Sequence, residues 1–133
     1  MDCLFCKIIQ GEIPSYTIYE DEIVKVFLDI NPNTNGHCLI IPKQHIVTVD
    51  EVDEKLATHI INVEKKIHAL LKEKLNIEGL TICQNNNLGQ AVKHYHVHLI
   101  PRYQNDNWEM NFNQELLETP NNIYQKITNE KGE

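Results

Sequence analysis

The sequence predicts a single α+β domain built on an antiparallel sheet. Short β-branched runs lie on both sides of one long amphipathic segment, and turn residues separate the runs. With 133 residues, of which 41% are hydrophobic and 23% charged, the chain has the composition of one globular domain. This length also suits one hydrophobic core.

Five segments are expected to be strands because each is rich in apolar residues and ends at a turn or a proline. They are residues 16–20, 23–29, 37–41, 79–84 and 94–100.

The clearest helix is predicted over residues 53–75, with Asp53 as its N-cap. Its apolar residues recur at spacings near 3.6, which marks one buried face. A short helical turn is expected over 6–11, ending at Gly11, and a weak helical pattern covers 123–127.

The net charge of −7 disfavours a protein that binds nucleic acid through a basic face. No apolar run approaches the roughly 20 residues that span a bilayer, and the N-terminus lacks a secretory signal pattern. We therefore expect a cytoplasmic protein with no membrane partner. Its four cysteines are then expected to be free thiols or metal ligands.

The segment from His94 to Ile100 carries the strongest functional signal. On a strand, His94, His96 and His98 would share one face, with neighbours about 7 Å apart, and the alternate residues would pack on the helix. Two adjacent imidazoles are able to chelate a metal. Alternatively, one imidazole attacks phosphorus and another holds the phosphate. The preceding loop favours the second interpretation, because its glycine lets the backbone approach a ligand closely and its amide side chains are neutral donors for a phosphate.

Cys3 and Cys6 form a Cys-x-x-Cys pair with three possible roles. A redox pair should follow a strand, and no strand precedes this one. A structural zinc needs four ligands, of which His45 and His94 are able to supply the remaining two. Free thiols are the third reading. Cys38 and Cys83 lie in apolar runs and are expected to be core residues.

The histidine segment resembles the signature of the histidine triad (HIT) family, His-φ-His-φ-His-φ-φ with φ apolar. The resemblance covers about residues 1–103 and leaves 104–133 as a C-terminal extension of a single HIT domain. Matching blocks outside the signature are residues 3–14, 27–32, 36–45 and 89–92. It implies an antiparallel meander sheet of about five strands with one long helix and a short N-terminal helix, usually paired into a homodimer.

The resemblance also implies an activity. Similar members hydrolyse nucleoside 5′-phosphoramidates or dinucleoside polyphosphates by attack at the α-phosphorus, through a nucleotidyl-histidine intermediate. By position, His96 would be the nucleophile, His98 would bind the phosphate, and His37 would lie near His96 to orient it or relay a proton. The ligand would be an AMP-like purine nucleotide, and no organic cofactor is expected. A nucleotide-binding protein without catalysis is the alternative.

The same resemblance assigns the remaining site residues. Asp29 would take the ribose hydroxyls, and the base pocket would be lined by Phe5, Phe27 and Ile30. The phosphate would face Asn85, Gly89, Gln90 and Ala91. Some bacterial-type members with the same Cys-x-x-Cys hold a structural zinc, which would be bound here by Cys3, Cys6, His45 and His94.

Two further pairs of residues are not assigned to the site. His59 and His68 are expected on the rim or surface of the long helix. Trp108 and Phe112 fit core packing, a dimer contact or a place near the partner's active site.

Overall fold

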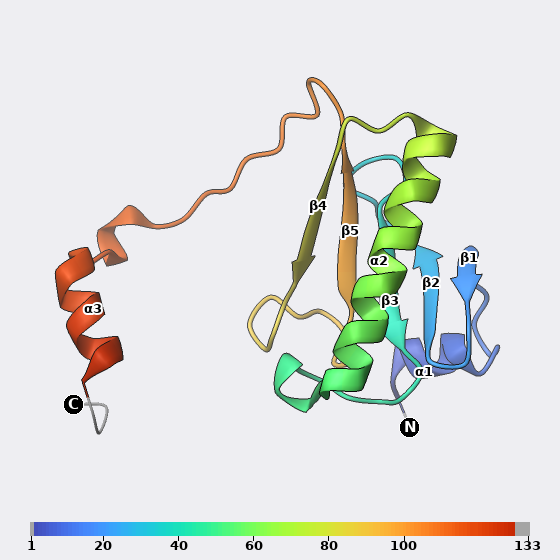
Figure 1. Cartoon of the computed structure of the whole chain (residues 1–133), viewed down its shortest axis with the longest axis horizontal. Coiled ribbons are helices and arrows are strands. Elements are labelled where there is room, and N and C mark those ends of the chain that lie inside the picture. The colour runs from blue at the N-terminus through green and yellow to red at the C-terminus, as the bar shows by residue number, and fades with distance from the viewer. Residues whose placement is uncertain (1, 130–133) are drawn as a thin grey trace.

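The computed structural model describes residues 2–129 and confirms the five-stranded α+β architecture (Figure 1). The elements in chain order are α1 (Leu4–Ile9), β1 (Thr17–Glu20), β2 (Val24–Leu28), β3 (Cys38–Pro42), α2 (Glu54–Leu75), β4 (Gly79–Gln84), β5 (Val97–Arg102) and α3 (Pro120–Thr128). Two short 3₁₀ turns cover Val49–Glu51 and Gln114–Leu116.

The sheet has the strand order β1-β2-β3-β5-β4, and all neighbouring pairs are antiparallel. β5 lies between β3 and β4, so the order departs from a simple meander after β3. As a result His98 sits in an interior strand, opposite Leu39 on one side and Cys83 on the other. An interior strand is held by ladder hydrogen bonds on both sides, which gives the histidine a fixed backbone.

α2 forms where the spacing of apolar residues predicts it. Asp53 caps it by accepting a hydrogen bond from the backbone N–H of Leu56 at 2.8 Å. The helix ends at Asn76, which adopts the left-handed conformation with φ of 52°. Its buried face consists of Leu56, Ile60, Val63, Ile67 and Leu71.

Both faces of the central strands are covered, which explains why β2 and β3 are almost continuously apolar. Val24, Val26 and Ile40 point to α2 and form the main core with it. The alternate residues Phe27, Leu39 and Ile41 point to the other face and pack with α1. The face that α1 covers is the one that carries the functional side chains.

The loop between β2 and β3 is pinned close to α2 and β5. Gly36 has a φ of +95°, and a Cβ at this position would lie 2.7 Å from Cδ1 of Leu75, so a residue without a side chain is required. The hydroxyl of Thr34 donates to the carbonyl of Pro101 at 2.7 Å. These contacts fix the position of His37, the next residue of the loop.

Two expectations about single residues change. Cys38 is buried, as predicted, and burial raises the pKa of its thiol to about 12. Cys83 is exposed, because β4 is an edge strand and this side of it is not covered. Within residues 2–129, no helix combines the length and apolar character needed to cross a bilayer.

The segment after Tyr103 leaves the sheet and runs outward to α3 (Figure 1). We call residues 104–128 the C-terminal arm. Its large apolar side chains are largely exposed, including Phe112 at 71% and Trp108 at 46%, so the core-packing reading of these two residues is wrong. The guanidinium of Arg102 lies 4.8 Å from the centre of the Trp108 ring.

Candidate active site and metal cluster

The three motif histidines do not share one strand. β5 begins at Val97, so only His98 belongs to it, while His94 and His96 precede it in an extended turn. The backbone N–H of Tyr95 bonds to the carbonyl of Ile46 at 2.7 Å and not into the sheet ladder, which turns this segment out of the sheet. The rings of His96 and His98 lie with their centres 5.0 Å apart.

A hydrogen bond determines which nitrogen of His96 carries the proton. Nδ1 of His96 lies 2.7 Å from the carbonyl oxygen of His94. Because a carbonyl only accepts, Nδ1 donates, and the lone pair of the neutral ring is on Nε2. The ring is 4% exposed and packs edge-on against Phe5, with ring centres 5.0 Å apart. His96 is thus held in the tautomer that a nucleophile needs.

A second hydrogen-bond chain gives His98 the opposite tautomer. The backbone N–H of Asn33 donates to Nδ1 of His37 at 3.1 Å, so Nε2 of neutral His37 carries the proton. This Nε2 lies 3.0 Å from Nδ1 of His98 and donates to it. Neutral His98 therefore carries its proton on Nε2, where it is available to donate to a ligand oxygen.

Both histidines in this chain favour the neutral form. Burial, followed by the neighbouring rings of His96 and His37, lowers the pKa of His98 to about 4. Burial also lowers the pKa of His37, although the nearby charge of Asp29 opposes that shift. We expected His37 to lie near His96; the structure places its ring against His98, with the carboxylate of Asp29 3.6 Å from Nε2. His37 and His98 therefore form a chain of two neutral rings, in which Nε2–H of His37 donates to Nδ1 of His98.

An apolar cavity of about 370 Å³ opens next to the two imidazoles. The expected residues Phe5, Phe27, Asp29, Ile30 and Ala91 all line it, together with His96 and His98. Phe5 and Phe27 meet edge to face with ring centres 5.6 Å apart. An apolar slot with one carboxylate at its edge matches a planar, hydroxyl-bearing ligand. The sequence reasoning missed Leu4, Ile8 and Ile13, whose apolar spacing around Phe5 is the signal for them.

The loop residues assigned to the phosphate divide into two groups. Gln90 is buried and ties the loop together, since its amide nitrogen donates to the carbonyl of Val47 at 2.6 Å and its oxygen accepts from Asn87. This use explains its presence without a ligand. Asn85 and Gly89 are exposed and lie side by side, and the phosphate role of these two residues stays a prediction.

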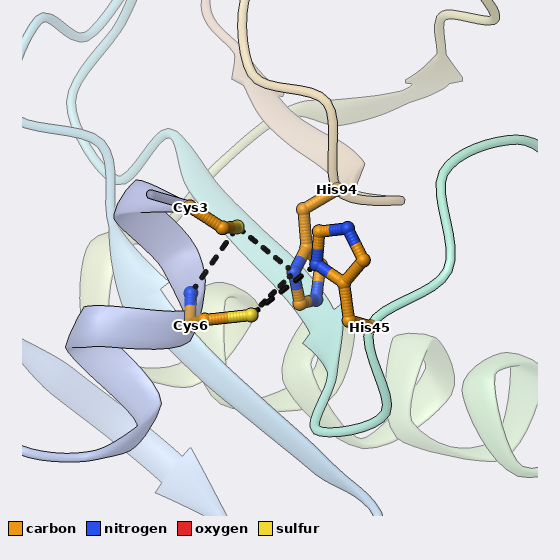
Figure 2. A group of neighbouring side chains, drawn as sticks. All are labelled: Cys3, Cys6, His45 and His94. Carbon is orange, nitrogen blue, oxygen red and sulfur yellow. Dashed lines mark hydrogen bonds between the residues drawn. The ribbon is translucent and has the colours of Figure 1, made fainter. Parts of the chain in front are cut away.

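The side chains of Cys3, Cys6, His45 and His94 point toward one another at the start of α1, as Figure 2 shows. We call these four residues the metal cluster; one ligand atom from each lies within 4.8 Å of all the others. Sγ of Cys3 is 3.3 Å from Nδ1 of His94, and Sγ of Cys6 is 3.2 Å from Nδ1 of His45. The edges of a tetrahedral zinc site with mixed sulfur and nitrogen ligands are about 3.5 Å long, so these separations fit zinc.

The proton positions in the metal cluster fit a metal as well. Nε2 of His94 donates to the carbonyl of Pro42 at 2.8 Å, so Nδ1 presents its lone pair to the two sulfur atoms. Burial lowers the pKa of His94, which favours the neutral ring that metals bind. Cys3 is also the N-cap of α1 and accepts from the N–H of Cys6, which brings both sulfur atoms to one end of the helix.

Asp29, His37 and His98 form a second group whose ligand atoms lie within 4.8 Å of one another. In this group the hydrogen bond between the two rings occupies Nδ1 of His98 and Nε2 of His37. The two rings therefore form a hydrogen-bonded chain. The ring of His94 points into the metal cluster, so the three motif histidines do not ligate one metal together.

Comparison with known proteins supports the family resemblance over most of the chain. A family model described as the HIT domain matches residues 10–105. An uncharacterized HIT-like protein of Methanocaldococcus jannaschii is 49% identical over 107 residues, which cover 78% of this chain and 81% of the relative. An adenosine 5′-monophosphoramidase of Candida albicans is 42% identical over 106 residues, covering 75% of this chain and 70% of the relative.

Solved structures agree with the fold. A HIT family protein of Bacillus anthracis superposes with a TM-score of 0.81 and 38% identity, over 93% of this chain and 91% of the other. A zinc-bound histidine triad family protein of Mycobacterium smegmatis gives a TM-score of 0.77 and 34% identity, over 86% of this chain and 84% of the other.

Proposed function

The chain belongs to the histidine triad (HIT) family, and from this premise we propose that it is an enzyme that cleaves nucleotides at the α-phosphorus, with nucleoside 5′-phosphoramidates as its substrate class. The observation that carries the proposal is the opposite placement of protons on His96 and His98. One ring offers a lone pair and its neighbour offers a donor, which are the two groups that a displacement at phosphorus requires.

The nucleoside would occupy the apolar cavity. The base would pack against the wall that the contacting rings of Phe5 and Phe27 form, and Ile30 also lines the slot. Asp29 lies at the rim, where its carboxylate is able to accept from ribose hydroxyls; one of its oxygens already accepts from the N–H of Asn31 at 2.9 Å. This placement directs the 5′-phosphate toward the two imidazoles.

In the first step Nε2 of His96 attacks the α-phosphorus. A nitrogen–phosphorus bond to His96 forms as the bond to the leaving amine breaks, and the amine takes up a proton from solvent. His98 donates through Nε2 to a phosphate oxygen and stabilises the charge that develops there. In the second step the oxygen of a water molecule attacks the phosphorus and loses a proton to solvent. The bond between phosphorus and Nε2 of His96 breaks, and the nucleoside monophosphate is released. Fixing the imidazole beside the phosphorus replaces a bimolecular encounter.

A relative that is 42% identical carries the name adenosine 5′-monophosphoramidase, which supports a phosphoramidate as the substrate. A dinucleoside polyphosphate would use the same two histidines, so it is a competing substrate. Binding without turnover is the competing function.

The test is turnover of an adenosine phosphoramidate by the wild type and by His96→Ala. We expect the variant to lose at least roughly 10³-fold in rate, because its nucleophile is gone. His59→Ala is the matched control, since His59 lies on α2 and pairs with Asp21. Intact-mass analysis after rapid quench should show a nucleotidyl adduct on wild type alone. Normal turnover by His96→Ala would refute the mechanism, and AMP binding without turnover would leave only a binding protein.

We also propose that the metal cluster binds a structural zinc. The donor set, its separations and the free lone pair of His94 support this assignment, as does the zinc-bound relative from Mycobacterium smegmatis. Metal analysis of the purified chain should give one zinc, and Cys6→Ser should lose it. Cys83→Ser is the control, because Cys83 lies outside the metal cluster.

The assembly that fits the C-terminal arm is a homodimer. Its exposed apolar residues need a covering surface, and the similarity to the Bacillus anthracis structure over 93% of this chain extends into the arm. Exposed apolar side chains on a segment that a relative also carries fit a contact between identical chains. Sedimentation equilibrium should give a dimer, and Phe112→Asp should shift it toward monomer. A monomeric wild type would refute this proposal.

A further inference from the structure

The short helix α1 belongs to the metal cluster and to the nucleotide cavity at the same time. Cys3 and Cys6 reach the metal cluster, while Leu4, Phe5 and Ile8 line the cavity. We propose that metal occupancy and nucleotide binding are positively coupled, with Phe5 and His94 as the positioning residues that transmit the coupling. The inference rests on the zinc site and the nucleotide ligand proposed above, and goes beyond both.

The first route runs through Phe5. This side chain is 5% exposed and stands between the two cysteines on the same helical turn. Its ring contacts Phe27, His96 and His94, with ring centres 5.6, 5.0 and 5.9 Å apart. A displacement of the sulfur atoms therefore displaces the wall of the cavity.

α1 has little ability to stay in place alone. It contains six residues, and isolated helices shorter than about 12 residues are marginal in water. Besides its apolar packing, α1 is held by Lys25, which donates to the carbonyl of Ile8 at 3.3 Å, and by the thiol–imidazole contacts within the metal cluster. Two metal–sulfur bonds at its N-terminus would add the strongest restraint on the helix.

The second route runs through His94, which faces both sites with different atoms. Its ring is fully buried, with Nδ1 toward the metal cluster and Nε2–H bonded to Pro42. Its carbonyl oxygen accepts a hydrogen bond from Nδ1–H of His96. Ligation of the ring fixes the residue, and the fixed carbonyl holds His96 in the tautomer that leaves Nε2 free.

These contacts predict coupling because ordering the same residues serves both ligands. If zinc has already fixed α1 and His94, the nucleotide does not have to order them on binding. Thermodynamic linkage then requires that the nucleotide strengthen zinc binding by the same factor. We expect a factor of about tenfold in each direction, within the usual range for coupled sites.

The experiment uses the full chain and measures the effect of zinc on AMP affinity and the effect of AMP on zinc affinity. AMP affinity is determined by calorimetry on the zinc-loaded and the zinc-free chain, after circular dichroism shows that both are folded. Zinc affinity is determined by competition with a chromophoric chelator, with and without saturating AMP. Should the zinc-free chain be unfolded, AMP affinity is compared between the zinc-loaded wild type and zinc-loaded His45→Ala, which keeps α1 and His94 but holds the metal with one ligand fewer, and the variant should bind AMP more weakly.

Two variants on α1 separate coupling from general stabilisation. Phe5→Ala keeps all four metal ligands but removes the shared wall, so we expect its coupling factor to fall below about twofold. Ile9→Ala also truncates an apolar residue of α1, but this residue does not line the cavity, so the full factor should remain. The ¹⁵N shifts of His96 should report protonated Nδ1 with zinc and a mixture of tautomers without it.

The outcomes are distinguishable. If AMP and zinc both bind but neither changes the affinity of the other, the coupling is refuted while both sites stand. The same holds if Phe5→Ala and Ile9→Ala behave alike. If AMP does not bind at all, the proposed function fails, and if zinc does not bind, the metal assignment fails.

Discussion

The pH dependence of folding gives a direct test of the hydrogen-bond chain through His98. Burial and the neighbouring imidazoles lower the pKa of this residue to about 4 in the folded chain. In the unfolded chain a histidine has a pKa of about 6.5. As the pH falls below 6.5, the unfolded chain takes up this proton first, so stability is lost until the pH reaches about 4.

The expected size follows from the two pKa values. Their separation of about 2.5 units corresponds to about 3 kcal/mol when the titration is complete, of which about 2 kcal/mol is lost by pH 5. His98→Gln still offers an oxygen that accepts from His37 but does not titrate. Between pH 7.5 and pH 5 its free energy of unfolding should therefore fall by about 2 kcal/mol less than that of the wild type.

The assay is urea unfolding, followed by far-ultraviolet circular dichroism, at several pH values for both proteins with zinc in excess. Release of metal by acid affects both proteins and cancels in the difference between them. His68→Gln on α2 is the control and should follow the wild type, since its side chain lies away from the site. Parallel curves for wild type and His98→Gln would refute the assignment of a buried, neutral His98.

Three further perturbations test the fold that supports the site. Ile67→Ala opens a cavity where the side chain is 1% exposed and should lower the free energy of unfolding by about 2–5 kcal/mol in urea titrations. Asp21→Asn weakens two 2.8 Å hydrogen bonds from the N–H groups of Ile23 and Val24 and should cost about 1–3 kcal/mol at pH 7. Burial opposes those bonds, yet they hold the pKa of Asp21 well below its usual value, so the difference from wild type should shrink in acid, and a pH-independent difference would contradict this reasoning. Gly36→Ala brings a Cβ to 2.7 Å from Leu75 at a φ of +95° and should cost about 1–3 kcal/mol, measured as a lower melting temperature.

The elements followed from the sequence because their signals are local. The apolar spacing from Leu56 to Leu71 and the cap at Asp53 predicted α2, and β4 has the predicted bounds. The insertion of β5 between β3 and β4 was not predictable in this way, since strand order depends on packing between distant segments. Nor was the exposure of Cys83, which follows from the edge position of its strand.

The site was predicted at the level of residue types but not of proton positions. The motif predicted His96 and His98 as catalytic residues, and the Cys-x-x-Cys pair led to His45 and His94 as the other zinc ligands. The direction of the hydrogen-bond chain depends on the backbone N–H of Asn33. Because every residue except proline has such a group, the residue type does not reveal this hydrogen bond. Local spacing also carries no information on whether Gln90 bonds to protein or to a ligand.

The metal cluster joins the two ends of the folded core. Cys3 and His94 are separated by 91 positions, and His37 and His98 by 61. During synthesis the thiols of Cys3 and Cys6 therefore leave the ribosome long before His94 has been made, and the pair of His37 and His98 does not exist until the chain has reached β5. Closing such long loops makes assembly of the sites a late event in folding. Bound metal would thus mark chains in which Cys3 and His94 have already come together.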